Sequence, residues 1–302
     1  MPGTGVAVAT AIDTVLQRRL IAPGQRPDVI VGLVGRGIGL SRSPAMHERE
    51  AARLGLSCAY VLIDFDTLGL QDADLAAALD AAASLGFSGL NVTYPFKQAV
   101  MPLLDAVAED AAAIGAVNTV VLGARRTGHN TDAWGYAQSF RATMADVPLE
   151  RVALIGAGGA GSAVAHALAE IGAGRIAIVD QDAARADELA ARLNRAGRVA
   201  AVATDARTAL ADADGVVNTT PVGMAKHPGM PFDAGLLRPG LWVSDVIYFP
   251  QETELLRRAR ALGCRTLPGI GMAIGQAARA FELFTGRTAD MAAMADHFEA
   301  AA

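Results

Sequence analysis

The pattern Gly156-Ala-Gly-Gly-Ala-Gly161 constrains the fold of this chain more than any other feature. Residues 152–155 before it form an apolar run that predicts a strand, and residues 162–171 after it predict a helix. In such a setting the first glycine permits a tight turn, the second lets the backbone approach a pyrophosphate, and the third lets helix and strand pack closely. The alternative is a plain glycine turn in an alanine-rich protein. We predict a dinucleotide site at the N-terminus of the helix, formed by Gly156, Ala157, Gly158, Gly159 and Ala160.

Asp180 ends the next predicted strand and indicates which dinucleotide the site binds. A carboxylate at this point can accept hydrogen bonds from the ribose hydroxyls of NAD. It would repel the additional phosphate of NADP, and Asp182 adds to that repulsion. Arg185 lies close enough to contribute, by stacking on the adenine. We therefore predict NAD as the cofactor.

The length of 302 residues and the alternation of strands and helices predict two α/β domains. The first is a mostly parallel sheet covered on both faces, and the second is a Rossmann domain that binds the dinucleotide. We assign 28–132 to a substrate-binding and catalytic domain completed by helices in 270–302, 149–269 to the NAD-binding domain, and 133–148 to a linking helix. Residues 1–27 are interpreted as a loosely attached extension, helical over 11–20.

The elements that we expect follow from apolar runs, periodicity and the positions of proline and glycine. Strands are predicted at 29–34, 59–64, 89–92, 119–122, 152–155, 175–180, 199–203, 215–218 and 241–246. Helices are predicted at 43–54, 72–85, 99–104, 106–114, 133–146, 162–171, 183–195, 272–285 and 289–300.

Composition excludes several classes of function. Hydrophobic residues make up 52% of the chain and the net charge is −5, which is typical of a globular protein without affinity for nucleic acid or an anionic membrane. Cys58 and Cys264 give neither a disulfide framework nor metal spacing, and the five histidines show no ligand spacing, so no metal is expected. The apolar N-terminal run ends at Asp13 and makes a poor signal peptide. We expect a cytoplasmic protein, monomer or homodimer, that acts on a small molecule.

The segment Asn91-Val-Thr-Tyr-Pro-Phe-Lys97 follows a predicted strand and presents polar side chains. Its proline disfavours helix at the preceding residue, so the chain turns sharply near the carboxyl edge of the sheet, where ligands of open α/β sheets bind. Lys97 and Lys226 are the only lysines among 26 basic residues. Lysine, unlike arginine, can give up its proton in a protein. Lys97 is therefore a candidate catalytic base, the alternative being a surface lysine retained by chance.

Asp132 is the candidate partner of Lys97. Hydride transfer from an alcohol requires that a proton leave as well, and Lys97 would remove it. A neighbouring carboxylate favours the protonated ammonium, so we expect Asp132 chiefly to orient the substrate hydroxyl and the ammonium together. Asp132 is also placed to act as the N-cap of the helix predicted from 133, and the two roles are compatible.

Other polar side chains stand near the ends of predicted elements. Ser41 and Ser43 are two residues apart at a helix N-terminus and can both donate to one carboxylate; the alternative is that Ser43 acts as an N-cap and Ser41 has no role. Asn118-Thr119, Asn130 and Gln276 are also near element ends; the alternative for each is a turn or cap residue. A polyhydroxylated ring acid would need about this many donors and acceptors.

The chain resembles the shikimate/quinate dehydrogenase family. The matching segments occur in family order: Ser41-Arg-Ser-Pro44, Asn91 to Lys97, Gly115-Ala-Val-Asn-Thr119, Asn130-Thr-Asp132, the glycine turn at 156–161, Asn218-Thr-Thr-Pro-Val-Gly-Met224, Asp245-Val-Ile-Tyr-Phe-Pro250, and Gly269-Ile-Gly-Met272 with Gln276. The resemblance implies oxidation of a ring hydroxyl of shikimate or quinate, or reduction of the 3-dehydro ketone. It implies Lys97 and Asp132 as the catalytic pair, Ser41 and Ser43 on the substrate carboxylate, and Thr93, Asn118, Tyr248 and Gln276 around the substrate. Val246 and Gly269 would line the nicotinamide side.

One segment departs from the NADP-dependent biosynthetic members, which usually have Asn-Arg-Thr where this chain has Asp180-Gln-Asp182. In that respect the chain is similar to the NAD-using quinate/shikimate branch. Ser43 and the segment Gly269-Ile-Gly-Met272 instead resemble the shikimate-preferring pattern. We expect NAD-dependent interconversion of shikimate and 3-dehydroshikimate, with quinate left open. The alternatives are a dehydrogenase for an amino-substituted shikimate or another polyol acid, and a silent ligand-binding member, against which the presence of both Lys97 and Asp132 argues.

Overall fold

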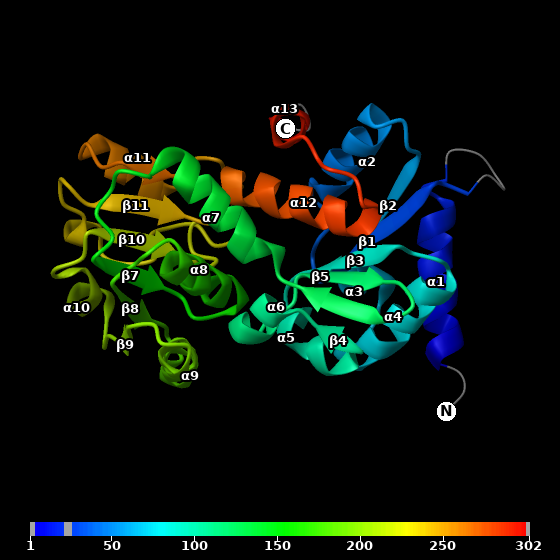
Figure 1. Ribbon diagram of the computed structural model, residues 1–302, viewed down its shortest axis with the longest axis horizontal. Coiled ribbons are helices and arrows are strands. Elements are labelled where there is room, and N and C mark those ends of the chain that lie inside the picture. The colour runs from blue at the N-terminus through cyan, green and yellow to red at the C-terminus, as the bar shows by residue number, and fades with distance from the viewer. Residues whose placement is uncertain (1–3, 21–25, 300–302) are drawn as a thin grey trace. The chain divides into compact units, whose positions relative to one another are not determined.

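The computed structural model describes residues 4–20 and 26–299, and the chain divides into two compact units. Unit 1 comprises Met1–Thr131 and Ala277–Ala302, and unit 2 comprises Asp132–Gln276 (Figure 1). Both boundaries fall inside helices, the first in α7 (Thr131–Thr143) and the second in α12 (Ile270–Thr285).

In the described part of unit 1, the strands form one mixed sheet in the order β2-β1-β3-β5-β6-β4. β1 pairs in parallel with β2 and β3, β5 is antiparallel to β3 and β6, and β4 is parallel to β6. The bounds are β1 Val29–Gly35, β2 Cys58–Asp64, β3 Gly89–Val92, β4 Ala106–Val107, β5 Thr119–Leu122 and β6 Arg126–His129.

Helices cover both faces of this sheet. Alternate residues of a strand point to opposite faces, and accordingly Ile30 and Val34 lie in a different core cluster from Val31 and Leu33. The first cluster includes residues of α1 and α4, and the second includes Phe284 near the end of α12. The helical bounds in unit 1 are α1 Thr4–Gln17, α2 Ser43–Arg53, α3 Phe65–Leu68, η1 Asp72–Asp74, α4 Leu75–Ser84, α5 Phe96–Ala99, η2 Met101–Leu103, α6 Glu109–Ile114 and α13 Met291–Glu299.

The N-terminal helix α1 is part of the core of unit 1. Val8, Ile12 and Leu16 recur every four residues, which puts them on one face of the helix, and all three are buried in the cluster that contains Leu79. Burial of such a side chain stabilises the fold by about 1.5–3 kcal/mol. The prediction of a loosely attached extension is therefore wrong for residues 4–20; its part at 21–25 lies outside the described residues.

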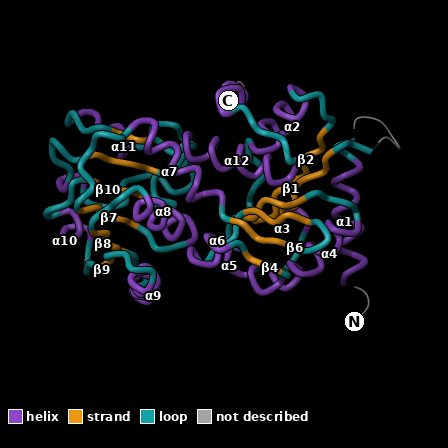
Figure 2. The backbone as a smooth tube through the Cα atoms, viewed as in Figure 1, coloured by secondary structure: helices purple, strands orange, loops and turns teal. Residues whose placement is uncertain are grey.

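The described strands of unit 2 form a wholly parallel sheet in the order β12-β11-β10-β7-β8-β9. Four of these strands, β10, β7, β8 and β9, are labelled in Figure 2, where strands are orange. One face carries α10 and α11, whose Leu210 and Leu255 pack in one cluster with Ile155 and Val243. The strands are β7 Arg151–Ile155, β8 Arg175–Val179, β9 Ala200–Val202, β10 Gly215–Asn218, β11 Trp242–Asp245 and β12 Thr266–Leu267. The helices are α8 Gly159–Glu170, α9 Ala183–Arg195, α10 Ala206–Leu210, η3 Ala234–Leu236 and α11 Glu254–Ala261.

Several local predictions need correction. Residues 106–114, predicted as one helix, form β4 and then α6, and the helix predicted at 99–104 is replaced by α5 and η2. The helix predicted from 133 already begins at Thr131. β6 and α11 were not predicted. Ser43 is the first residue of α2 rather than its N-cap, a position taken by Arg42.

Candidate active site

Several of the predicted polar residues stand at one edge of the sheet of unit 1; all belong to unit 1 except Asp132, which is the first residue of unit 2 and directly follows Thr131. Parallel β1 and β3 end at this edge, antiparallel β5 begins there, and β6 ends there, because Val34 pairs with Val92, Asn91 with Thr119, and Thr119 with His129. The predicted side chains stand directly beyond these strand ends: Ser41 and Ser43 after β1, Thr93 and Lys97 after β3, Asn118 before β5, and Asp132 after β6.

Lys97 is a half-buried residue of α5, the short helix that follows β3. Its carbonyl accepts a hydrogen bond from the Val117 N–H at 2.8 Å, and the Asn118 carbonyl accepts one from the Val92 N–H at 2.7 Å. The neighbouring Phe96 is buried with its ring centroid 4.6 Å from that of Phe65. The backbone of Lys97 is thereby fixed beside Asn118.

Asp132 is buried and is the second residue of α7. The helix begins at Thr131, so Asp132 lies in the first turn and is not the N-cap that the alternative interpretation required. A carboxylate in the first turn is favoured by the helix dipole. The start of the helix is held by Asn118, whose Oδ1 accepts from the Thr131 N–H at 2.7 Å and whose Nδ2 donates to the Thr131 Oγ1 at 2.9 Å.

Ser41 and Ser43 form a hydroxyl pair at the start of α2. Ser41 Oγ lies 3.2 Å from Ser43 Oγ and accepts from the Ser43 N–H at 3.3 Å. Both residues are half-buried. The preceding turn is tied down by the Asp64 carboxylate, which accepts from the N–H groups of Gly37 and Ile38 at 3.0 and 3.1 Å. The pair is thus presented by a rigid turn at a helix N-terminus, a suitable place for a carboxylate.

Thr93 is fixed by a close approach to Gly35. Its N–H donates to the Val34 carbonyl at 3.0 Å. A Cβ added to Gly35 would lie 2.4 Å from the Thr93 Cγ2, so only glycine fits at the end of β1. Of the polar residues predicted for the substrate, Tyr248 and Gln276 belong to unit 2. Tyr248 has 39% of its surface exposed, and half-buried Gln276 donates from Nε2 to the Ala273 carbonyl at 3.2 Å.

The glycine turn of unit 2 has the geometry that a pyrophosphate requires. Gly156 has φ of 106°, a left-handed conformation that favours glycine. A Cβ on Gly161 would lie 2.2 Å from the Gly156 carbonyl oxygen, so the helix can pack this closely only without a side chain. A Cβ on Gly158, the N-cap of α8, would meet nothing within 4 Å. The second glycine therefore borders open space at the helix N-terminus, where phosphates bind.

Asp180 faces this turn from the end of β8. Its Oδ2 accepts from the Ala157 N–H at 2.6 Å and its Oδ1 from the Asp182 N–H at 2.9 Å. Asp182 in turn caps α9 by accepting from the Ala184 N–H, and Arg185 pairs with Asp182 at 3.3 Å. The carboxylate of Asp180 thus stands beside the glycine turn, and the nearby arginine is engaged by the second aspartate.

Gly269 and Val246 lie against each other, since a Cβ on Gly269 would be 2.2 Å from the Val246 carbonyl oxygen. The loops around them are held by Asp245, a role that our sequence analysis did not assign. This fully buried carboxylate accepts from Asn218 Nδ2, the Ile247 N–H and Thr253 Oγ1, the last at 2.7 Å. Burial raises the pKa of Asp245 to about 6. Asn218 and Asp245 each begin a segment that matches a motif of the family, and this match could have identified both residues from the sequence.

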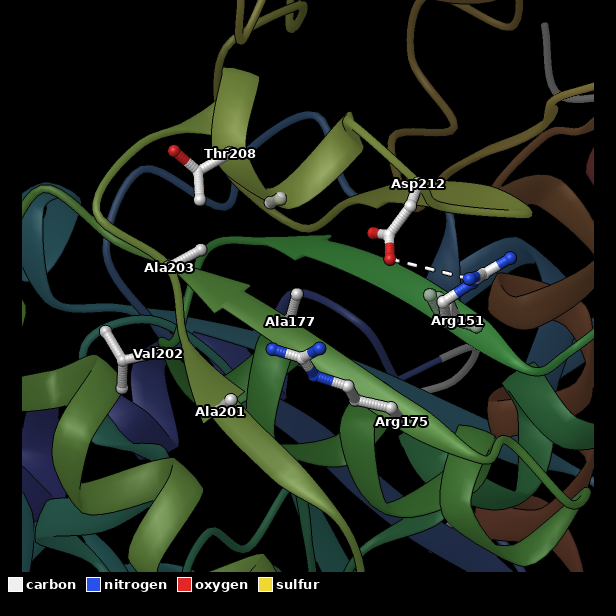
Figure 3. A pocket seen from close by; sticks show the side chains of 10 residues that line it. Arg151, Arg175, Ala177, Ala201, Val202, Ala203, Thr208 and Asp212 are labelled. Carbon is white, nitrogen blue, oxygen red and sulfur yellow. Dashed lines mark ion pairs between the residues drawn. The ribbon is translucent and has the colours of Figure 1, made fainter.

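A small cavity of about 70 Å³ lies elsewhere on the sheet of unit 2 and is lined by Arg151, Arg175 and Thr208 among others (Figure 3). The two arginines begin β7 and β8, whereas Gly156 and Asp180 follow the ends of these strands. None of the predicted site residues lines this cavity.

Residues 4–20 and 26–299 contain no group of three or more His, Cys, Asp or Glu side chains arranged to hold a metal ion. Nor does any helix among them have the length and apolarity needed to cross a membrane.

The fold and these sites define a class: a two-unit α/β oxidoreductase with a dinucleotide-binding unit and a separate polar site at a sheet edge. Comparison with known proteins narrows the class. Residues 33–120 match the family described as the shikimate dehydrogenase substrate binding domain, and 269–297 match the shikimate 5'-dehydrogenase C-terminal domain. Residues 139–220 match the ThiF family. The chain belongs to the shikimate/quinate dehydrogenase family, as the motifs predicted.

Individual relatives support this membership over nearly the whole chain. A shikimate dehydrogenase (NADP⁺) of Streptomyces avermitilis is 55% identical over 90% of this chain and 96% of its own length. A quinate/shikimate dehydrogenase (NAD⁺) of Corynebacterium glutamicum is 50% identical over 89% of this chain and 98% of its own. The structure of quinate dehydrogenase from Corynebacterium glutamicum in complex with NAD superimposes with a TM-score of 0.84 at 47% identity, covering 90% of this chain and 99% of that one. All three relatives are named with a nicotinamide dinucleotide: NADP⁺ for the first, and NAD for the other two.

Proposed function

We propose that this protein is an NAD-dependent dehydrogenase that interconverts shikimate and 3-dehydroshikimate. The proposal is carried by the position of five polar residues, all next to strand ends at one edge of the sheet of unit 1. These residues are Ser41, Ser43, Lys97, Asn118 and Asp132. A cyclic acid with several hydroxyls offers a carboxylate to the serines and hydroxyls to the amide and the charged groups.

The proposed chemistry divides between a proton and a hydride. The reacting ring hydroxyl donates its single hydrogen to the neutral Lys97 amine, which takes up that proton as the C–O bond becomes a carbonyl. Asp132 accepts a hydrogen bond from the Lys97 nitrogen and so orients it toward the hydroxyl oxygen. The glycine turn at 156–161 and Asp180 would hold the dinucleotide, whose nicotinamide would supply a hydride acceptor for the same carbon. In the reverse direction the Lys97 ammonium returns the proton to the carbonyl oxygen. The other side chains bind and orient the ring so that this single hydroxyl faces Lys97.

Substitution of Lys97 tests the catalytic assignment. In Lys97→Ala we expect kcat for shikimate oxidation, followed by NADH absorbance, to fall about 10²- to 10⁴-fold, the usual contribution of general acid–base catalysis. The dissociation constant of shikimate should change far less. Lys226→Ala is the matched control, because Lys226 is the other lysine of the chain and is exposed. Normal turnover by Lys97→Ala would remove the assignment, and a wild-type protein that binds shikimate without turnover would identify a silent family member.

The preference for NAD rests on the charge at the end of β8. Asp180 and Asp182 stand there and Arg185 pairs with Asp182, so these three groups together would present net negative charge to a phosphate on the adenosine ribose. We expect kcat/KM with NAD to exceed that with NADP by at least about tenfold, which corresponds to roughly 1.4 kcal/mol. Asp180→Asn keeps the acceptor for the Ala157 N–H and removes the charge, so it should move this ratio toward NADP. Equal or better efficiency of the wild type with NADP would contradict the preference.

Quinate is the second candidate substrate, favoured by the 47% identity and TM-score of 0.84 with the quinate dehydrogenase structure. A panel of shikimate, quinate and amino-substituted shikimates, measured with the better cofactor, distinguishes these substrates. We expect shikimate to give the highest kcat/KM, and a higher value for any other compound would replace it as the proposed substrate.

A further inference from the structure

We propose that Tyr60, through a buried chain of hydrogen bonds, is a positioning residue for the substrate site: it sets the orientation of the Asn118 amide and holds the start of the helix that contains Asp132. The inference rests on the proposed function for its kinetic consequence. It concerns residues to which the family resemblance gave no role: Tyr60, Thr119 and Thr131.

The chain of hydrogen bonds begins on β2, crosses the intervening strand β1 to reach β3, and continues to β5. Tyr60 Oη donates to Asn91 Oδ1 at 2.8 Å, and Asn91 Nδ2 donates to Thr119 Oγ1 at 3.1 Å. Thr119 Oγ1 donates to Asn118 Oδ1 at 3.1 Å, and Asn118 Nδ2 donates to Thr131 Oγ1 at 2.9 Å. All five residues are at least nine-tenths buried. Water is therefore a poor substitute for any partner that is lost.

Each link in this chain has a fixed direction. An amide oxygen only accepts, so the Tyr60 hydroxyl must donate to Asn91 Oδ1, and this places the Asn91 NH₂ group toward Thr119. Thr119 Oγ1 accepts from Asn91, and its single hydrogen lies within reach of Asn118 Oδ1 at 3.1 Å and of Thr131 Oγ1 at 3.4 Å. We assign the hydrogen to Asn118 Oδ1, because that contact is the shorter one and an amide oxygen only accepts. The Asn118 oxygen is consequently turned inward, where it also accepts from the Thr131 N–H at 2.7 Å. One N–H of Asn118 is bonded to Thr131 Oγ1 and the second remains for a ligand.

Removal of the Tyr60 hydroxyl would act on Asn118 at a distance. Without that donor, Asn91 can flip its amide and turn Oδ1 toward Thr119. Thr119 would then donate to Asn91 instead of Asn118, and one of the donors that hold the Asn118 oxygen inward would be lost. Since Thr131 immediately precedes Asp132, the same change loosens the first turn of α7. A shift of about 1 Å in such a group can reduce turnover by about 10²-fold.

The test compares substitutions that remove only a hydroxyl. For Tyr60→Phe and Thr119→Val we expect kcat/KM for shikimate with NAD to fall about 10- to 100-fold, with the KM for NAD unchanged. Thr119→Ser keeps the hydroxyl and should remain within about threefold of the wild type, roughly 0.7 kcal/mol. Tyr136→Phe is the control for loss of a buried tyrosine hydroxyl, because Tyr136 is 1% exposed and its Oη lies beside the Ser244 hydroxyl, outside the chain of hydrogen bonds that begins at Tyr60. It should retain wild-type kinetics.

A second measurement is independent of catalysis. In ¹⁵N NMR spectra we expect Tyr60→Phe to shift the side-chain NH₂ signals of Asn91 and Asn118, and to speed exchange of the Thr131 amide about tenfold or more, which is about 1.4 kcal/mol of lost protection. Unchanged signals, or equal activity losses in Thr119→Ser and Thr119→Val, would overturn the positioning role. If the wild type oxidises neither shikimate nor quinate, the proposed function fails while the NMR measurement still decides the network.

Discussion

At the scale of single residues, His47 is a buried imidazole without a hydrogen bond. Its side chain is 1% exposed, both ring nitrogens lack a partner among the described residues, and the rings of Tyr60, Phe281 and Phe284 surround it at centroid distances of 4.9 to 6.1 Å. Burial lowers the pKa of His47 from 6.5 to about 3. The folded state therefore holds the neutral imidazole.

This histidine should make unit 1 sensitive to acid. The unfolded chain takes up the proton first as pH falls, so the stability due to neutral His47 is complete above pH 6.5 and is lost toward pH 3. Between pH 7 and pH 4 the loss amounts to roughly 3 kcal/mol, from 1.36 kcal/mol per pKa unit. We expect His47→Leu to abolish that part of the acid dependence, measured by urea unfolding with hydrogen exchange of β1 and β2 amides. The same acid loss in the variant and the wild type would show that other groups are responsible.

The roles of single residues could be predicted from the sequence where a rare residue type or a motif distinguished them. Lys97 stood out because the chain has only one other lysine, and Asp180 because it follows a strand and a glycine turn. Tyr60 could not be identified in this way. A tyrosine within an apolar strand suggests core packing, and its hydroxyl acquires a partner only when β1 and β3 bring Asn91 within 2.8 Å.

At the scale of elements, α7 and α12 approach so closely within unit 2 that their backbones touch. A Cβ on Gly135 would lie 2.6 Å from the Gln276 nitrogen and 2.7 Å from the Met272 carbonyl oxygen, and a Cβ on Gly275 would lie 2.8 Å from the Gly135 Cα. Each helix also contains one of the two limits between the units, Thr131/Asp132 in α7 and Gln276/Ala277 in α12.

Gly135→Ala should consequently separate the two helices. Because the nearest atoms are backbone, the methyl group cannot be accommodated by a side-chain rotation, and we expect a loss of about 1–3 kcal/mol, the usual cost of overpacking. Thermal and urea unfolding would measure this loss. The control is Gly5→Ala in α1, where a Cβ meets nothing within 4 Å and alanine favours the helix by up to about 1 kcal/mol. Equal stabilities of Gly135→Ala and the wild type would contradict the contact.

Elements with a strong local signal were predicted at their observed bounds, and those that depend on partners were not. The strands at 89–92 and 215–218 and the helix at 183–195 agree with β3, β10 and α9. β6 has the sequence Arg-Thr-Gly-His, which has no apolar run, and it becomes a strand by pairing with β5 and β4. The two residues of β4 are likewise too few to distinguish from the helix that follows.

At the scale of the whole molecule, the two-domain α/β architecture was predictable because each half repeats strand and helix signals of its own. The order of the family motifs along the chain added the function. The limits of the compact units fall at Thr131/Asp132 and Gln276/Ala277, inside continuous helices. The first limit lies in the polar run Gly128-His-Asn-Thr-Asp132 and is one residue from the predicted domain end at 132. The second limit lies within one helical pattern, seven residues beyond the predicted end at 269.

The packing of α1 also bears on how the protein should be handled. The similarity to the substrate binding domain of the family begins only at residue 33, which invites trimming of everything before it. Such trimming would remove the first four of the seven residues of β1, a strand that lies between β2 and β3. A shorter truncation that begins at Val29 would still remove Val8, Ile12 and Leu16 from their packing with Leu79. The apolar surface exposed by this truncation would favour aggregation. Recombinant protein should therefore retain α1.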